Sequence, residues 1–400
     1  MSGTAEGRPR ARDLGIRLGI LEPGRYNAIT DVGDVRVGHV TIADEGSADP
    51  PRGPARTGVT VILPHGGNTF RQKVPAAFHV INGFGKAAGV TQLQEFGTLE
   101  TPVALTSTLS VGAAFEGLVR HALAANPEIG RGAGNVNPVV AECSDALLSD
   151  IRSLVVRPEH VLDAIAAAQP GPVAEGSVGA GTGMICYGWK GGIGTASRKT
   201  SADAGSHVVG ALVLANFGQP GDLRIGGVPV GESLRPPEPP APAPAGDSRG
   251  AGGSCVVVLA TTAPADSRQL GRLARRVQNG LAWTGTFSEN NSGEYAVAFS
   301  TARLIPHVPG AEQIAVTVLP EDEPVMNLLF RAVAESVEEA VINALLGAGS
   351  GPAGPVSAGS ASAGPLPGRS VGVPLPAGPL AKLLAASGRL TAGSRGRAGG

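Results

Sequence analysis

Gly252-Gly253-Ser254-Cys255 stands immediately before a short apolar run, Val256-Val257-Val258-Leu259-Ala260. The run is rich in β-branched residues, as expected of a strand that is buried on both faces. Upstream, residues 233–253 (SLRPPEPPAPAPAGDSRGAGG) are rich in Pro, Ala and Gly and cannot form a core. Ser254 is therefore expected where a linker enters a buried core strand, at the edge of a sheet.

Strands and helices are predicted on both sides of this junction. Alternating or continuous β-branched segments predict strands at 29–32, 35–40, 58–63, 103–106, 207–215, 256–261, 296–300, 314–318 and 371–375. Apolar residues at helical spacing predict helices at 111–125, 266–281, 324–346 and 380–386. Strands alternate with helices, but the strand content is high. This pattern favours a layered α/β sandwich over a parallel doubly wound sheet.

Composition limits the kind of protein. The 400 residues are 42% hydrophobic and carry a net charge of −1. This charge gives no overall positive electrostatic potential that would favour binding to nucleic acid or to an anionic membrane. The three cysteines, Cys143, Cys186 and Cys255, are scattered and odd in number, which suits a reducing compartment. Residues 1–13 are polar, and no apolar run approaches the length of a membrane span. A cytoplasmic protein is expected.

Ser254 is the candidate nucleophile. A cut before it would give an N-terminal serine that carries both a hydroxyl and a free amine. Ser292 and Glu294 precede the strand at 296–300, and a hydroxyl and a carboxylate two residues apart can orient or relay a proton. A serine after Gly-Gly is ordinarily only part of a linker. The strand that follows and the spacing to 292 and 294 favour the reactive role.

Two further polar residues end apolar runs. Asn216 closes the run 207–215, where a side-chain amide can donate to an oxyanion. Because Asn-x-Gly is also common in turns, a purely structural role for Asn216 stays open. Glu142 ends Val139-Val140-Ala141 and could hold a substrate ammonium, or could be a surface carboxylate.

Other signals are weak. The glycine run 176–183 has no strand–GxGxxG–helix context, so a nucleotide loop is disfavoured. The seven histidines lack metal-ligand spacing and the cysteines form no CxxC, so no metal and no cofactor are expected. Arginines at 268–276 are expected to form a solvated helix face.

Several segments, in order, resemble the family of self-processing L-aminopeptidases/D-amino-acid esterases and β-aminopeptidases. The most specific are the block 178–198 (VGAGTGMICYGWKGGIGTASR) and the 254/292/294 spacing. Support comes from 27–32, 35–39, 57–60, 106–112, 226–231, 272–276 and 292–301. The resemblance covers roughly residues 10–346 and the terminal strand and helix at 369–388.

The resemblance implies cleavage between Gly253 and Ser254, giving an α chain (1–253) and a β chain (254–400) that form one structural domain. The fold implied is α+β, a four-layer αββα sandwich similar to N-terminal-nucleophile hydrolases but with different connectivity. Residues 1–13 are expected as a loose arm, 347–368 as a second linker and 389–400 as a frayed tail. A homo-oligomer of αβ units, commonly a tetramer, is also implied.

Roles follow by motif. The resemblance implies that Ser254 is the nucleophile, that Ser292 and Glu294 assist it, that Asn216 serves the oxyanion and that Glu142 holds the free amino group. Family substrates are short peptides, amides and esters with a small unblocked N-terminal residue of the L-α, D-α or β type.

The chain departs from the family pattern at Leu147, which takes the place of a tyrosine found near the oxyanion in one branch. Two alternatives stay open. One is an acyl transferase on the same fold, although the related ornithine acetyltransferases use threonine as nucleophile. The other is an unprocessed, non-catalytic homologue with the proline-rich linker as an interaction tail.

Overall fold

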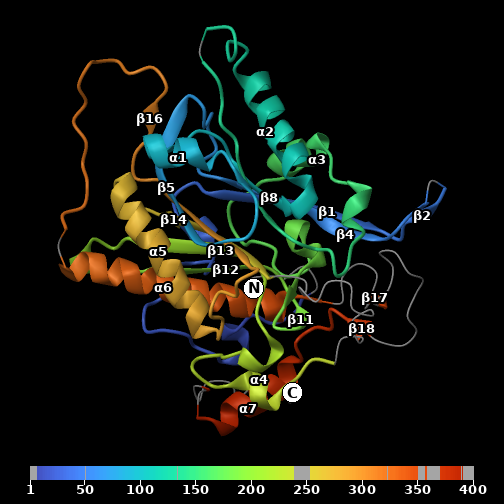
Figure 1. Ribbon diagram of the computed structural model, residues 1–400. Helices are drawn as coiled ribbons and strands as arrows, with labels where there is room; N and C mark the ends of the chain where they lie inside the picture. Colours follow the sequence, from blue (N-terminus) through green and yellow to red (C-terminus); the bar gives the residue numbers. More distant parts are fainter. Residues whose placement is uncertain are drawn as a thin grey trace, which may run out of the picture.

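Two stacked β-sheets lie between two layers of helices in the computed structural model (Figure 1). The structure describes residues 7–237 except 50 and 133, residues 253–349 except 322, residues 356–357 and 370–388, and residue 390. Most of both predicted linkers and nearly all of the predicted tail lie outside the described residues.

The first sheet contains Ser254 and is built around β14. In spatial order its main strands are β12 (Gly192–Lys199), β13 (Val208–Asn216), β14 (Ser254–Thr261), β15 (Gly293–Ser300), β5 (Gln72–Gly83) and β16 (Ile305–Pro306), with β7 (Thr98–Leu99) also on β5. β14 runs antiparallel to β13 and parallel to β15. The predicted buried strand is thus a central strand.

The second sheet packs against one face of the first. Its order is β1 (Arg36–Asp44), β4 (Ala55–Leu63), β8 (Val103–Ser107), β9 (Val139–Cys143) and β6 (Ala87–Ala88). Because side chains alternate along a strand, Val256 and Val258 face this sheet and share a core with Ile62 and Leu105.

Helices cover both outer faces. Val257 and Leu259 face the layer of α5 (Ser267–Trp283) and α6 (Glu323–Gly347). On the other side, α2 (Val111–Ala125) and α3 (Pro158–Ala166) cover the second sheet. The α+β fold class and the αββα layering are confirmed. No described helix has the length and apolarity required to span a membrane.

Most predicted elements are present with shifted ends, and the helix at 111–125 has the predicted bounds. The remaining elements are short, apart from α7 near the C-terminus. They are α1 (Val90–Phe96), α4 (Val230–Ser233), α7 (Ala377–Ala386), β2 (Ser47–Ala48), β3 (Pro51–Arg52), β10 (Ile185–Cys186), β11 (Trp189–Lys190), β17 (Val356–Ser357) and β18 (Ser370–Val371).

Two strand predictions are wrong, and a third, 371–375, is met only at Val371, the last residue of the two-residue strand β18. Ile29–Asp31 is a short 3-10 helix, because the Asp31 carboxylate accepts the N–H groups of Tyr26 and Ala28 and closes a turn. Residues 314–318 have the alternation of a strand, but they pair with no described strand, and Ile314, Val316 and Val318 are exposed.

The prediction of a loose arm over residues 1–13 is wrong for residues 8–13. Ala11 is fully buried, and the side chain of Arg10 forms an ion pair with Glu175 (Nε–Oε2 2.7 Å). Arg12 pairs with Glu339 of α6 (Nε–Oε1 2.8 Å). These arginines bind carboxylates inside the fold, so this part of the segment is docked against the first sheet and α6.

Arg198 is the centre of this buried charge network. Its guanidinium is fully buried and lies 3.2 Å from Glu335 Oε2 and 2.6 Å from Glu339 Oε2. It also donates to the carbonyl oxygens of Leu18 and Ser197. Through Leu18, Glu335 and Glu339, Arg198 of β12 holds the N-terminal segment and α6 together. The arginine therefore has a structural role.

Candidate active site

Ser254 lies where strand ends of the two sheets meet. It is the first residue of β14, is 5% exposed, and pairs with Asn216 on β13 and Gly293 on β15. Its Oγ accepts the Asn216 Nδ2–H group (2.9 Å) and the backbone N–H of Ser144 (3.2 Å). The structure therefore brings two of the predicted residues together and adds an amide from the end of β9.

The Asn216 amide is held in one orientation. Its Oδ1 accepts the Ile185 N–H (2.9 Å), so Nδ2 faces Ser254 and also donates to the carbonyl oxygen of Ser144 (2.9 Å). A preoriented N–H next to a nucleophilic hydroxyl is the arrangement that stabilises a developing oxyanion.

Ser292 and Glu294 form a hydroxyl–carboxylate pair beside Gly253. Ser292 Oγ donates to Glu294 Oε1 (2.8 Å), and Ser288 Oγ donates to Oε2 (2.6 Å). Burial raises the pKa of Glu294, and the two serine hydrogen bonds partly oppose this rise. The pair can therefore exchange a proton closer to neutrality than an ordinary glutamate.

Gly253 connects this pair to Ser254. A Cβ atom at Gly253 would lie 3.2 Å from Ser292 Oγ, so the hydroxyl is next to the 253–254 peptide bond. The carbonyl oxygen of Gly253 accepts the N–H of Gly293 (3.1 Å). Among the described residues, no hydrogen bond joins Ser254 Oγ directly to Ser292 or Glu294.

Glu142 is a buried carboxylate at the end of β9, two residues before Ser144. It is 3% exposed, and its Oε1 accepts the N–H of Lys86 (3.0 Å) while Oε2 accepts the Thr108 hydroxyl. The largely exposed Lys86 ammonium lies 3.9 Å from Oε1. Glu142 is thus placed near the nucleophile, and a cation already approaches it from the solvent side.

Tyr295 is a site residue that the sequence analysis missed. A Cβ atom at Gly85 would lie 2.9 Å from the Tyr295 hydroxyl oxygen and 3.1 Å from Glu142 Oε1, so both groups converge above this glycine. Tyr295 pairs with Val256 and therefore shares the sheet face of Ser254. Ser144, Ser288, Lys86 and Thr108 were missed as well, because no motif marks them and only the fold brings them to the site.

Among the described residues, the Leu147 side chain makes no hydrophobic packing contact that would hold it at the candidate site. Its side chain is 51% exposed and belongs to none of the hydrophobic clusters of the described residues. Ser144 is the residue of this segment that contacts Ser254. A role for Leu147 in substrate choice remains a prediction.

The described histidines and cysteines have structural surroundings. No group of three or more His, Cys, Asp or Glu side chains within the described residues could hold a metal ion. Burial lowers the pKa of His39 to about 4, so its ring is neutral where it meets Thr60. All three cysteines are free and buried, and burial raises the pKa of each thiol.

Known proteins are similar to this chain both in sequence and in fold. The beta-peptidyl aminopeptidase BapA of Sphingosinicella microcystinivorans is 42% identical over 355 residues, 87% of each chain. A Burkholderia sp. beta-aminopeptidase superposes with a TM-score of 0.82 at 43% identity, covering 95% of this chain and 99% of that one.

A third protein extends the comparison. The L-aminopeptidase D-Ala-esterase/amidase of Ochrobactrum anthropi superposes with a TM-score of 0.84 at 37% identity, covering 96% of this chain and all of that one. It is described as a prototype for the serine aminopeptidases and a new variant among the Ntn hydrolase fold.

The layered fold, with a serine at the start of a central strand, defines a variant of the N-terminal-nucleophile hydrolase fold. The model of Peptidase family S58 matches residues 27–354, and the chain therefore belongs to this peptidase family.

Proposed function

We propose that this protein is a self-activating serine aminopeptidase that releases small, unblocked N-terminal residues from short peptides, amides or esters through an acyl-enzyme on Ser254. The observation that carries the proposal is the position of Ser254 Oγ, which follows Gly253 and accepts N–H groups from Asn216 and Ser144. The relatives named as β-aminopeptidases and as an L-aminopeptidase support the same activity.

Maturation is the first step of the proposal. Ser254 Oγ attacks the Gly253 carbonyl carbon, forming an ester as the C–N bond to Ser254 breaks, and the hydroxyl proton moves to the departing nitrogen. Water then hydrolyses the ester to a Gly253 carboxylate and a free Ser254. The Gly293 N–H, 3.1 Å from the Gly253 oxygen, stabilises the charge that develops there.

Turnover repeats this chemistry on a substrate. Ser254 Oγ attacks the substrate carbonyl, and its proton passes to the new α-amine, whose reference pKa is about 7.7–8.0, or to the Ser292–Glu294 pair. Asn216 and Ser144 donate to the oxyanion, and Glu142 with the nearby Tyr295 hydroxyl receives the substrate ammonium. The bond from the carbonyl carbon to the leaving amine or alcohol then breaks, and the leaving group takes up the proton. Water hydrolyses the ester that remains on Ser254, which releases the amino acid and restores the hydroxyl.

The two chains would remain one domain after the cut. All eight residues of β14 pair with β13, and β15 pairs with β5, so strands from before and after residue 253 alternate in one sheet. A homo-oligomer of these αβ units, a tetramer in the family pattern, is part of the same proposal.

The test is the intact mass of the purified protein under denaturing conditions. Two species, residues 1–253 and 254–400, are expected for the natural sequence, and one full-length species for Ser254→Ala. Cys255→Ala is the matched control, because this neighbouring buried side chain faces the helical layer and should leave cleavage intact.

Activity is then assayed with small amino-acid amides, free and N-acetylated. Turnover of only the free amines, absent from Ser254→Ala, is expected. A Ser254→Ala chain still cut before residue 254 would overturn the maturation scheme. A natural chain that stays whole and hydrolyses nothing would show a non-catalytic homologue.

A further inference from the structure

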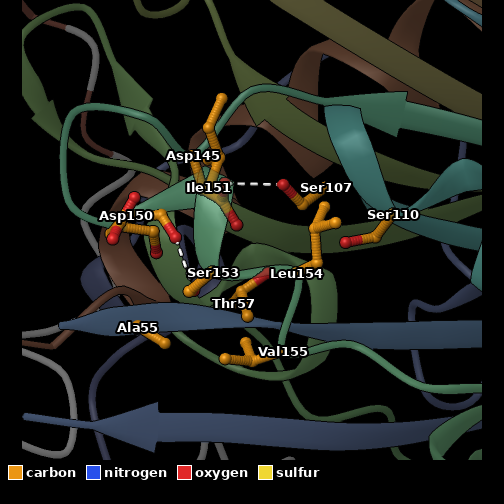
Figure 2. Close-up of a pocket in the computed structure, with 11 residues that line it drawn as sticks. Ala55, Thr57, Ser107, Ser110, Asp145, Asp150, Ile151, Ser153, Leu154 and Val155 are labelled. Atoms are coloured by element: carbon orange, nitrogen blue, oxygen red, sulfur yellow. Dashed lines mark hydrogen bonds between the residues drawn. The ribbon is translucent and has the colours of Figure 1, made fainter. Parts of the chain in front are cut away.

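A small cavity lined by hydroxyl and carboxyl groups lies behind the strand ends that carry the site (Figure 2). Its volume is about 10 Å³, close to the space of a single water molecule or small ion. The polar side chains that line it are Thr57, Ser107, Ser110, Asp145, Ser149, Asp150 and Ser153. Of its described lining residues, none is Lys, Arg or His.

Two buried oxygen atoms of this lining make no hydrogen bond of ordinary geometry with the described groups, although the Thr57 hydroxyl is close enough to the Asp145 carboxyl to oppose the rise of its pKa. They are Asp145 Oδ2 and Thr57 Oγ1, in side chains that are 1% and 4% exposed. The other carboxyl oxygen of Asp145 accepts the Ser107 hydroxyl (2.7 Å). Buried polar atoms are almost always hydrogen-bonded or coordinated, so the two free oxygens indicate an occupant of the cavity.

The charge of the cavity is uncompensated. Asp150 uses its two carboxyl oxygens on the N–H groups of Arg152 and Gly53. Asp145 has no cation beside it, since the nearby Arg56 guanidinium is engaged by Glu45 and by the carbonyl oxygens of Asp44 and Ala55. Burial, reinforced by the charge of Glu142, raises the pKa of Asp145 to about 6. A buried carboxylate in this state needs a counter-charge at neutral pH.

We propose that this cavity binds one small monovalent cation, such as sodium, held by Asp145 Oδ2, Thr57 Oγ1 and the neighbouring serine hydroxyls. All of the donors are oxygen atoms, which suit hard cations rather than zinc or copper. One unpaired carboxylate balances one positive charge, and this favours a monovalent over a divalent ion. The sequence analysis expected no metal, and no sequence spacing reveals this set.

The bound ion would act on the active site through the chain. Asp145 follows Ser144, whose N–H donates to Ser254 Oγ, and Ser107 precedes Thr108, whose hydroxyl donates to Glu142. An ion bound to Asp145 Oδ2 and Thr57 Oγ1 would add to the Ser107–Asp145 hydrogen bond and hold the segment after β9 against the end of β8 and against β4. Asp145 is a positioning residue and does not touch the reacting atoms.

The experiment compares the thermal midpoint of the full protein in sodium chloride and in N-methylglucamine chloride at matched ionic strength. Sodium should raise the midpoint by about 1–3 °C and saturate, as expected for an ion that binds only the folded state. Asp145→Asn should abolish the difference, whereas Asp203→Asn, an exposed control, should keep it.

Two further measurements make the test decisive even if Asp145→Asn folds poorly. Ser110→Ala keeps the negative charge of the cavity and removes one hydroxyl. The sodium concentration that gives half of the thermal stabilisation should therefore be higher for this variant. Sodium NMR lines should broaden with the natural protein and Asp203→Asn but not with Asp145→Asn. Equal thermal midpoints in the two salts, together with sodium NMR lines that do not broaden, would overturn the proposal. The cavity would then hold a water molecule instead of a cation.

Discussion

Arg198 and Ser254 lie in the same sheet, but the buried polar side chains around them, which include residues of α6 and of the second sheet, are stabilised in opposite ways. Arg198 is fully buried and neutralised by Glu335 and Glu339. At the Ser254 end, Glu142 and Glu294 accept hydroxyl and backbone N–H groups, and no arginine is paired with them among the described residues. Paired charges fix the fold around Arg198, whereas the carboxylates near Ser254 are held by hydroxyl and backbone N–H groups, as the proposed proton transfer and substrate binding require.

The largest effect is expected from breaking the paired network. Arg198→Met removes the buried guanidinium that neutralises Glu335 and Glu339 and leaves Arg12 as the remaining cation on Glu339, which should lower the free energy of unfolding by about 3–5 kcal/mol. Urea unfolding followed by circular dichroism measures this loss. Arg275→Met, on the exposed face of α5, is the control and should change stability little. A loss no larger than that of the control would remove the contrast between the two groups.

A change at the Ser254 end should cost rate rather than stability. Asn216→Ala removes one N–H donor beside Ser254 Oγ, so kcat should fall by about 10²–10³ and cleavage at residue 253 should slow as well. Steady-state kinetics per processed N-terminus measures the effect, with Asn279→Ala on the exposed face of α5 as control. Unchanged kcat with a large loss of stability would place Asn216 with the structural residues.

The smallest effect concerns the pH profile. Because burial raises the pKa of Glu294, the acidic limb of kcat/KM should lie above the range of an ordinary glutamate, and activity should fall as the pH drops through this pKa. The charge of Glu289 contributes to the rise, so Glu289→Gln should move the limb to lower pH. If the acidic limb does not move in Glu289→Gln, or if it persists in Glu294→Gln, a group other than Glu294 produces it.

Much of the fold could be predicted because local pattern and tertiary structure agree. The apolar spacing of 111–125 yields the helix directly, and the linker followed by 256–260 identifies β14. Where they disagree, the prediction fails. The segment 29–32 looks like a strand, yet the Asp31 carboxylate closes a turn there. The segment 314–318 alternates but has no described partner strand.

The site was predictable only where a motif marks it. Ser254 and Asn216 end or begin apolar runs, and the structure brings them together. Tyr295 could not be found, because its approach to Glu142 depends on the register that opposes Val256 to Tyr295. Ser144 acts through its backbone N–H, which every residue except proline possesses. Arg10 and Arg12 were assigned to a loose arm because their carboxylate partners, Glu175 and Glu339, lie 165 and 327 residues away in the sequence.

The two N–H donors to Ser254 come from different sheets, so folding must precede the proposed self-cleavage in the cell. One donor lies at residue 144 in the second sheet, the other at residue 216 in the first, and both reach Ser254 only once the two sheets have assembled. Under the proposed self-cleavage, backbone scission then works as an internal quality check. A chain that has not closed its sheets keeps its α-amine locked in a peptide bond, and it stays inert among the peptides that surround it during synthesis.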